Sequence, residues 1–207
     1  DYLRAVADAV HQVGGLFVLD CIASGTIWVD MKACGVDVLV SAPQKGWSSS
    51  PCAALVMLSE LARQRIDGTT STSFACDLRK WLQVMEAYEG GAHMYHTTMP
   101  TDALTRLCAT MRESRTYGFA KLASEQQVLG DKVRALFESR GLRSVAAPGF
   151  KAPGVVVSYT DDTGLHSGAK FLALGLQTAA GVPLQCDEPA EFRTFRVGLF
   201  GLDKLHN

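Results

Sequence analysis

The fold is decided by two short stretches of sequence, LFVLDCIASG at residues 16–25 and GVDVLVSAPQK at residues 35–45. The apolar run Leu16–Leu19 leads directly into Asp20, and the run Val36–Val40 leads into a polar loop. Short apolar runs that are bounded by turn residues are typical of strands buried in a parallel sheet. We therefore predict two buried parallel strands at these positions.

Helical patterns flank the two strands. Apolar residues recur at helical spacing through Tyr2–Val13, and the glycine pair at 14–15 ends that helix. A helical turn is expected at Met31–Cys34 and a third strand at Ala53–Leu58. Strands that alternate with helices at this spacing predict an α/β sheet.

The second half of the chain is mostly helical and then mixed. A helix is expected through Leu78–Tyr88, and a long helical run, with a break near Gly118, through Pro100–Arg140. Two short strands and one helix follow, at Val155–Tyr159, Phe192–Leu199 and Gly168–Leu176. We predict a large α/β domain with a mainly parallel sheet in residues 1–116, and a smaller C-terminal α+β domain in residues 117–207.

Composition excludes several classes of function. The formal net charge is -1 and no block of basic residues stands out, so there is no electrostatic case for nucleic acid or an anionic membrane surface. Apolar runs such as Ala53–Leu58 are too short to span a bilayer. His93, His96, His166 and His206 lack metal-ligand spacing, so no metal is expected. No signal peptide is visible, and we expect a cytoplasmic protein.

The six cysteines are scattered along the chain without a C-x-x-C pair. Several have apolar neighbours, as Cys108 does between Leu107 and Ala109. Cysteine behaves as a small hydrophobic residue in such surroundings. We predict reduced thiols in the core of the protein.

Asp20 and Lys45 are candidates for chemistry because each follows a predicted strand. Ligands gather at the carboxyl ends of strands in α/β sheets, and a lysine whose pKa is lowered can attack an aldehyde. Taken singly, Asp20 could be a turn cap and Lys45 a solvated loop residue. Together they match the needs of pyridoxal phosphate (PLP), which requires a lysine for a Schiff base and an acid beside its pyridine nitrogen. If the two strands are neighbours, both side chains can reach one ring.

The stretches at residues 19–25 and 35–45 resemble class V aminotransferases of the alanine–glyoxylate and serine–glyoxylate group, which are PLP enzymes of fold type I. The resemblance implies that Asp20 pairs with the pyridine nitrogen and that Lys45 forms the Schiff base. It also implies that Ile22 packs against the ring and that Gln44 binds the phosphate. The related cysteine desulfurases have His in place of Gln44.

Two later stretches fit the same family. MYHTTMP at residues 94–100 resembles the segment that reaches across the dimer, where Tyr95 and Thr98 bind the phosphate of the neighbouring subunit's PLP. The alternative is that Thr98 caps a helix. FRVGLFG at residues 195–201 resembles the strand whose arginine binds the substrate α-carboxylate, which implies this role for Arg196. The alternatives are a surface salt bridge, or Arg193 as the binding residue.

The resemblance implies transamination between a small amino acid, alanine or serine, and a 2-oxo acid such as glyoxylate or pyruvate. It also implies a homodimer with shared active sites. The alternatives are a lyase or desulfurase that uses a loop cysteine such as Cys186, and a catalytically incomplete fragment that only dimerises. The family has a segment before residue 1 and a longer final helix, so we expect the chain to be a fragment that lacks the N-terminal part.

Overall fold

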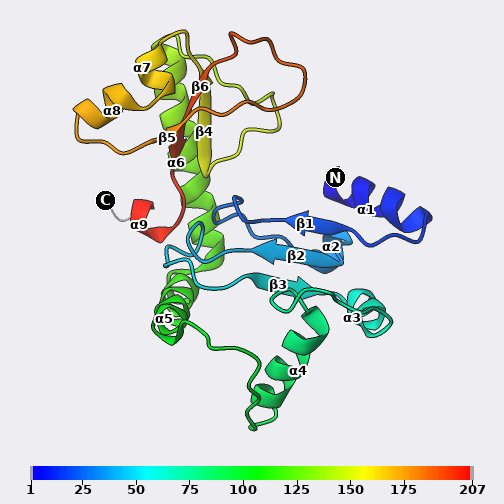
Figure 1. The fold of residues 1–207 in the computed structure, drawn as a ribbon. Helices are drawn as coiled ribbons and strands as arrows, with labels where there is room; N and C mark the ends of the chain where they lie inside the picture. Colours follow the sequence, from blue (N-terminus) through cyan, green and yellow to red (C-terminus); the bar gives the residue numbers. More distant parts are fainter. Residues whose placement is uncertain (1, 206–207) are drawn as a thin grey trace. The chain divides into compact units, whose positions relative to one another are not determined.

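The computed structural model describes residues 2–205, and its chain divides into two compact units (Figure 1). The first unit comprises Asp1–Cys21, Val29–Ser41 and Cys52–Thr105, and the second comprises Ile22–Trp28, Ala42–Pro51 and Arg106–Asn207. The chain therefore passes between the units several times before residue 106. The predicted division into domains at residues 116/117 stays a prediction.

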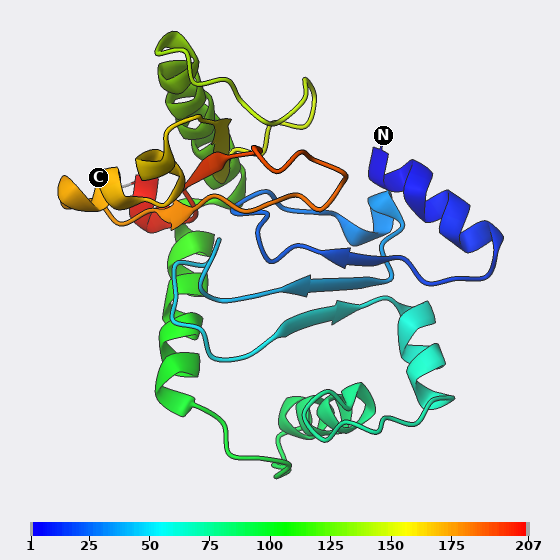
Figure 2. The ribbon, with the colours of Figure 1, turned by 45° about the horizontal axis from the view of Figure 1, so that its top comes forward.

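The sheet of the first unit has three strands in the order β1 (Val18–Asp20), β2 (Val38–Ser41) and β3 (Leu55–Leu58) (Figure 2). β1 and β2 are parallel, with Asp20 opposite Val40, as predicted for neighbouring strands. β3 is antiparallel to β2, so the described part of this sheet is mixed. The loop of residues 42–54 contains no helix that could carry the chain back for a parallel pairing.

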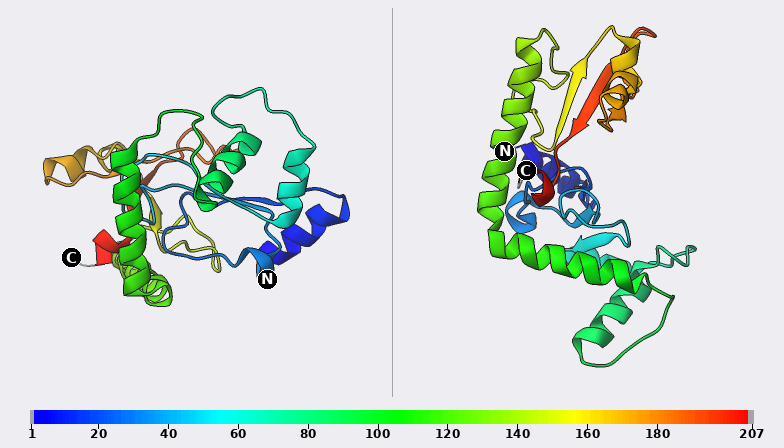
Figure 3. Two further views of the ribbon diagram at one scale, coloured as in Figure 1. Left: turned by 90° about the horizontal axis from the view of Figure 1, so that it is seen from below. Right: turned by 90° about the vertical axis from the view of Figure 1, so that its left-hand side faces the viewer.

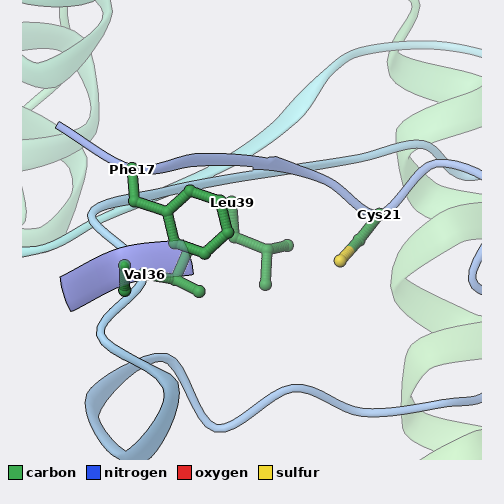
Figure 4. Packing of buried hydrophobic residues seen from close by; sticks show 5 residues of the cluster. Phe17, Cys21, Val36 and Leu39 are labelled. Atoms are coloured by element: carbon green, nitrogen blue, oxygen red, sulfur yellow. The ribbon is translucent and has the colours of Figure 1, made fainter. Parts of the chain in front are cut away.

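The core of this unit lies on one face of the sheet. Phe17, Cys21, Val36 and Leu39 pack together with Ala7 (Figure 4). Because side chains alternate along a strand, the residue between Phe17 and Leu19 points to the opposite face. That residue is Val18, which is 57% exposed, so the prediction that β1 is fully buried is wrong.

Among the described residues, four helices lie wholly in the first unit: α1 (Tyr2–Gln12), α2 (Met31–Cys34), α3 (Glu60–Asp67) and α4 (Leu78–Glu89). α2 matches the predicted turn, and Asp30 caps it by accepting a hydrogen bond from the Ala33 amide. Leu3, Val6 and Val10 of α1 pack against the core. Val13 was predicted to continue this face, but it follows the end of α1 and is 84% exposed.

A buried carboxylate ties α1 to the sheet. Asp37 Oδ2 accepts hydrogen bonds from His11 Nε2 (2.7 Å) and from the Phe17 amide (2.8 Å), and Asp37 Oδ1 accepts one from Ser59 Oγ (3.0 Å). Burial acts to raise the pKa of Asp37, but these hydrogen bonds outweigh it and hold the pKa below its ordinary value. Local sequence patterns do not predict this network, because the partners of Asp37 come from separate segments.

The predicted long helical run consists of two helices, α5 (Thr101–Tyr117) and α6 (Phe119–Ser139). α6 and the part of α5 from Arg106 onward belong to the second unit. Gly118 separates the two helices with φ 103°, a conformation that glycine adopts without strain. The chain turns sharply there (Figure 3, right). The predicted break near Gly118 is confirmed.

The sheet of the second unit is antiparallel, in the order β4 (Val155–Tyr159), β6 (Thr194–Gly198) and β5 (Ala179–Ala180). β4 has the predicted bounds, and β6 lies within the predicted strand at 192–199. Phe195 of β6 is 1% exposed, and its ring lies 5.4 Å from that of Phe137 on α6. Three short helices complete the unit, α7 (Thr163–His166), α8 (Ala169–Ala173) and α9 (Leu202–Leu205).

The prediction of core cysteines is wrong for half of these residues. Cys21 is buried, but Cys76, Cys108 and Cys186 are exposed. Successive residues of a helix point about 100° apart, so Cys108 of α5 faces solvent although its neighbour Leu107 is buried. Apolar neighbours in sequence therefore do not place a helical residue in the core.

Candidate functional site

Lys45 lies in a loop of the second unit that we call the Lys45 loop, residues 42–51. The side chain is partly buried, and its Nζ lies 5.6 Å from the centroid of the Phe200 ring. Within residues 2–205 the amine has no hydrogen bond and no ion pair. No acid of the described residues therefore pairs with this amine.

Two glycines allow the Lys45 loop to pack closely. A Cβ atom added at Gly46 would lie 1.9 Å from the carbonyl oxygen of Gly25. A Cβ atom added at Gly201 would lie 2.0 Å from Ser48 Oγ and 3.2 Å from the carbonyl oxygen of Lys45. Real Cβ atoms do not approach other atoms so closely, so this packing requires glycine at both positions.

The C-terminal segment also holds the Lys45 loop by a hydrogen bond. Ser48 Oγ donates to Asp203 Oδ1 over 2.6 Å. Ser48 has φ 53°, in the left-handed region that is uncommon for residues other than glycine. Backbone strain of this kind persists where the surrounding contacts impose it.

Three more predicted site residues belong to the second unit. Gln44 is exposed in the Lys45 loop, and Ile22 is partly buried at the start of the 22–28 segment. Arg196 lies on β6, where its Nε donates to the carbonyl oxygen of Ala180 over 3.1 Å. Its two terminal guanidinium nitrogens have no partner within the described residues 2–205. These two nitrogens form the fork that matches a carboxylate.

The remaining predicted site residues belong to the first unit. Asp20 is the last residue of β1 and is exposed. The Tyr95 hydroxyl and Thr98 Oγ1 are hydrogen-bonded to each other over 3.1 Å. α5 begins at Thr101, so the alternative that Thr98 caps this helix is wrong. The structure thus brings Tyr95 and Thr98 together as a pair of hydroxyl groups.

Solved structures of other proteins share the fold of this chain. No family profile matches the chain. Among solved structures, the alanine–glyoxylate aminotransferase of Nostoc sp. has a TM-score of 0.80 at 20% identity, covering 99% of this chain and 54% of that one. Ureidoglycine–glyoxylate aminotransferase of Bacillus subtilis has a TM-score of 0.77 at 21% identity, covering 98% and 51%. The fold is that of the fold type I aminotransferases.

Sequence similarity agrees with this aminotransferase fold. An alanine–glyoxylate aminotransferase of Felis catus is 34% identical over 110 residues, which are 51% of this chain and 26% of the relative. Alanine–glyoxylate aminotransferase 1 of Saccharomyces cerevisiae is 29% identical over 131 residues, 58% of this chain and 33% of the relative. The resemblance to class V aminotransferases is confirmed, and the chain spans about a third or less of these curated relatives.

Taken one at a time, several side chains suit parts of an aldehyde that carries a phosphate. In the second unit, Lys45 offers an amine without an acid partner in the described residues. In the first unit, Tyr95 and Thr98 offer two adjacent hydroxyl groups; one donates to the other, and the second is a donor of the kind that a phosphate accepts. Arg196 adds a cationic fork for a carboxylate. Among residues 2–205 there is no group of His, Cys, Asp and Glu arranged to hold a metal ion, and His206 lies outside the described residues.

Several residues around Lys45 were not identified from the sequence. Phe200 contacts Lys45 and Asp203 contacts Ser48 of the same loop, but both lie in a segment far from the loop in sequence. The sequence contained one sign of close packing around Lys45, because glycine follows this lysine directly at Gly46 and ends the Arg196 stretch at Gly201.

A membrane-spanning helix needs a long apolar stretch, and none of the helices in residues 2–205 has one.

Proposed function

We propose that this chain belongs to a PLP-dependent aminotransferase and carries its cofactor lysine, Lys45. The enzyme transfers an amino group from a small amino acid, alanine or serine, to a 2-oxo acid such as glyoxylate or pyruvate. One observation carries the proposal: in an aminotransferase fold, the Lys45 amine follows β2, is partly buried and has no acid partner in residues 2–205. The names of the curated relatives support the choice of alanine and glyoxylate.

Lys45 and Asp20 carry the proton chemistry in this proposal. Bound PLP supplies a conjugated ring that accepts the negative charge left at the substrate α-carbon. The Lys45 amine would remove the proton from that carbon as general base and deliver it, as general acid, to the C4′ carbon of the cofactor. The Asp20 carboxylate holds a proton on the pyridine nitrogen, because an adjacent negative charge favours the cationic form. The parallel pairing of β1 and β2 supports a joint role, since Asp20 ends β1 and Lys45 follows β2.

The other predicted residues bind and orient. Gln44, Tyr95 and Thr98 donate hydrogen bonds to the phosphate, and Ile22 packs against a face of the ring. Arg196 binds the substrate carboxylate through its terminal nitrogens, which fixes the direction of the bond that is broken. Tyr95 and Thr98 act on the neighbouring subunit's cofactor, so the enzyme is a homodimer with shared active sites. We place the enzyme in the cytoplasm.

The test is chemical labelling of the full-length protein. Borohydride reduces a lysine–PLP linkage and abolishes its visible absorption band, after which peptide mass mapping locates the pyridoxyl group. We expect the group on Lys45. A pyridoxyl group on the exposed Lys32, or on Lys80, would overturn the assignment, and a protein without a visible band would support the alternative of a catalytically silent module.

The second alternative is a lyase or desulfurase that uses Cys186. This cysteine is exposed in a loop, as such chemistry requires, but the similar proteins named above are aminotransferases. A panel of amino donors separates the two reactions. Transamination converts alanine or serine and a 2-oxo acid into a new amino acid and a new 2-oxo acid. A desulfurase instead converts cysteine to alanine and transfers the sulfur to the thiol of its loop cysteine, and it needs no 2-oxo acid.

A further inference from the structure

Ser48 and Asp203 form a contact that the proposed mechanism does not use. They lie 155 positions apart in sequence, and the 2.6 Å hydrogen bond between them joins the Lys45 loop to α9. Ser48 is three residues after Lys45, and its amide donates to the Lys45 carbonyl oxygen over 3.1 Å. The same serine is therefore bonded to the backbone of the lysine on one side and to the C-terminal segment on the other.

The Asp203 carboxylate is a strong acceptor for this contact. Burial acts to raise its pKa, but hydrogen bonds from Lys204 and Ser48 outweigh burial and lower the pKa from its ordinary value. The group is therefore ionised at neutral pH. A hydrogen bond to an ionised acceptor is shorter and stronger than one between neutral groups, which agrees with the 2.6 Å distance.

The segment that leads to Asp203 also lies against Lys45. The Phe200 ring is 5.6 Å from Lys45 Nζ and fills a space bordered by glycines. A Cβ atom at Gly154 would lie 2.9 Å from Phe200 Cδ1, and one at Gly25 would lie 3.4 Å from the same atom. The ring is therefore confined, and a confined ring beside the lysine restricts where the amine can lie.

We propose that Ser48 and Asp203 are positioning residues, which hold the Lys45 loop against the Leu199–Asp203 segment so that the Lys45 amine keeps one place beside the Phe200 ring. This inference rests on the proposed function, because it assigns the position of the amine that the proposed chemistry uses. It goes beyond that function by making the position of the lysine depend on the C-terminal segment, which also follows Arg196 in the chain.

The first experiment does not involve the cofactor. Hydrogen exchange is measured on the full-length protein without PLP, for the parent, Ser48→Ala, Asp203→Ala and the double variant. We expect amides of residues 42–51 to exchange about tenfold faster in each variant, and no faster in the double variant than in the worse single one. Asp203→Asn keeps an acceptor oxygen and should restore most of the protection. Lys204→Ala, the matched control, removes the other partner of Asp203 and should change little.

The second experiment measures the lysine. With PLP bound, the pH at which the visible band of the lysine linkage changes should shift in Ser48→Ala and Asp203→Ala, and the amino-acid half-reaction should slow by about 10- to 100-fold. Asp162→Ala, which removes a helix cap elsewhere in the same unit, should lower the melting temperature and leave both readouts unchanged.

The outcomes separate the two proposals. Unchanged exchange in residues 42–51 overturns the inference, as does faster exchange with an unchanged visible band and half-reaction. A parent protein that forms no linkage at Lys45 overturns the proposed function itself, and with it the inference. The two failures can be told apart, because the hydrogen-exchange comparison is made without the cofactor and does not depend on a linkage at Lys45.

Discussion

Two loops of the second unit are held in different ways. The Lys45 loop is held by residues far away in sequence, through the close approach of Gly46 to Gly25 and the bond from Ser48 to Asp203. The loop between β5 and β6, residues 181–193, is held largely by its own residues. Glu188 accepts hydrogen bonds from the amides of Gln185 and Cys186, each over 2.7 Å.

This difference shows which part of the unit depends on the whole fold. A loop that is held by distant segments keeps its geometry only while those segments are in place, and any movement of them moves the loop. A loop that is held by its own hydrogen bonds can move as a piece without disturbing the core. Under the proposed function, the Lys45 amine needs the first arrangement, and the loop before the strand that carries Arg196 can tolerate the second.

The largest expected effect is on substrate binding, and it should leave the Lys45 loop unchanged. Replacing Arg196 by alanine should cost about 2–5 kcal/mol of substrate binding, because the carboxylate loses a bidentate partner. The visible band of the cofactor should stay nearly unchanged, since Arg196 is not among the contacts of the Lys45 loop. The measurement is the alanine concentration that half-converts the cofactor. Arg196→Lys should recover part of the loss.

An amine without a carboxylate is the control substrate for this prediction, and it should be almost indifferent to Arg196→Ala. Equal losses for both kinds of substrate would indicate a damaged fold. Normal binding of alanine by the variant would show that Arg196 is structural, and Arg193 would be the next residue to test.

The next effect concerns the Lys45 loop alone. Gly46→Ala places a Cβ atom 1.9 Å from the Gly25 oxygen, so the backbone must move, at a cost of about 1–3 kcal/mol of unfolding free energy. The fraction of Lys45 that is labelled by PLP should fall together with the free energy of unfolding. The control is Gly68→Ala, where φ is -85° and the nearest atom to the new Cβ lies 3.7 Å away. Equal melting temperatures for the two variants would contradict the tight packing.

The smallest effect is expected in the loop between β5 and β6. Hydrogen bonds from the Gln185 and Cys186 amides lower the pKa of Glu188 to about 2. A folded-state pKa below the ordinary value stabilises the loop at neutral pH, and this contribution is lost as the pH falls from about 4.5 to about 2. Glu188→Ala should speed proteolysis within residues 182–191 at neutral pH and leave the global melting temperature unchanged.

A melting temperature that fell in Glu188→Ala as far as in Gly46→Ala would erase the distinction between the two loops. In the parent, acid should loosen the same segment. Hydrogen exchange of the Gln185 and Cys186 amides, corrected for the intrinsic effect of pH, should lose protection only below pH 4.5.

The sequence by itself determined the features that depend on neighbouring residues. Apolar runs located β1, β2 and β3 to within two residues, and Gly118 marked the break between α5 and α6. These features follow from local patterns of apolar side chains and from the backbone freedom of glycine, so a short window of sequence contains the necessary information. The resemblance to aminotransferases likewise rested on short stretches, at residues 19–25, 35–45, 94–100 and 195–201.

Only the tertiary structure decided which side chains meet. The exposure of Val18, the antiparallel pairing of β3 and the contact of Ser48 with Asp203 each depend on segments that approach one another through the fold. Local sequence cannot specify such contacts, because packing selects them from many sterically possible pairs. The sequence could name Lys45 as a candidate for the cofactor lysine, but only the folded chain shows which segments hold its loop in place.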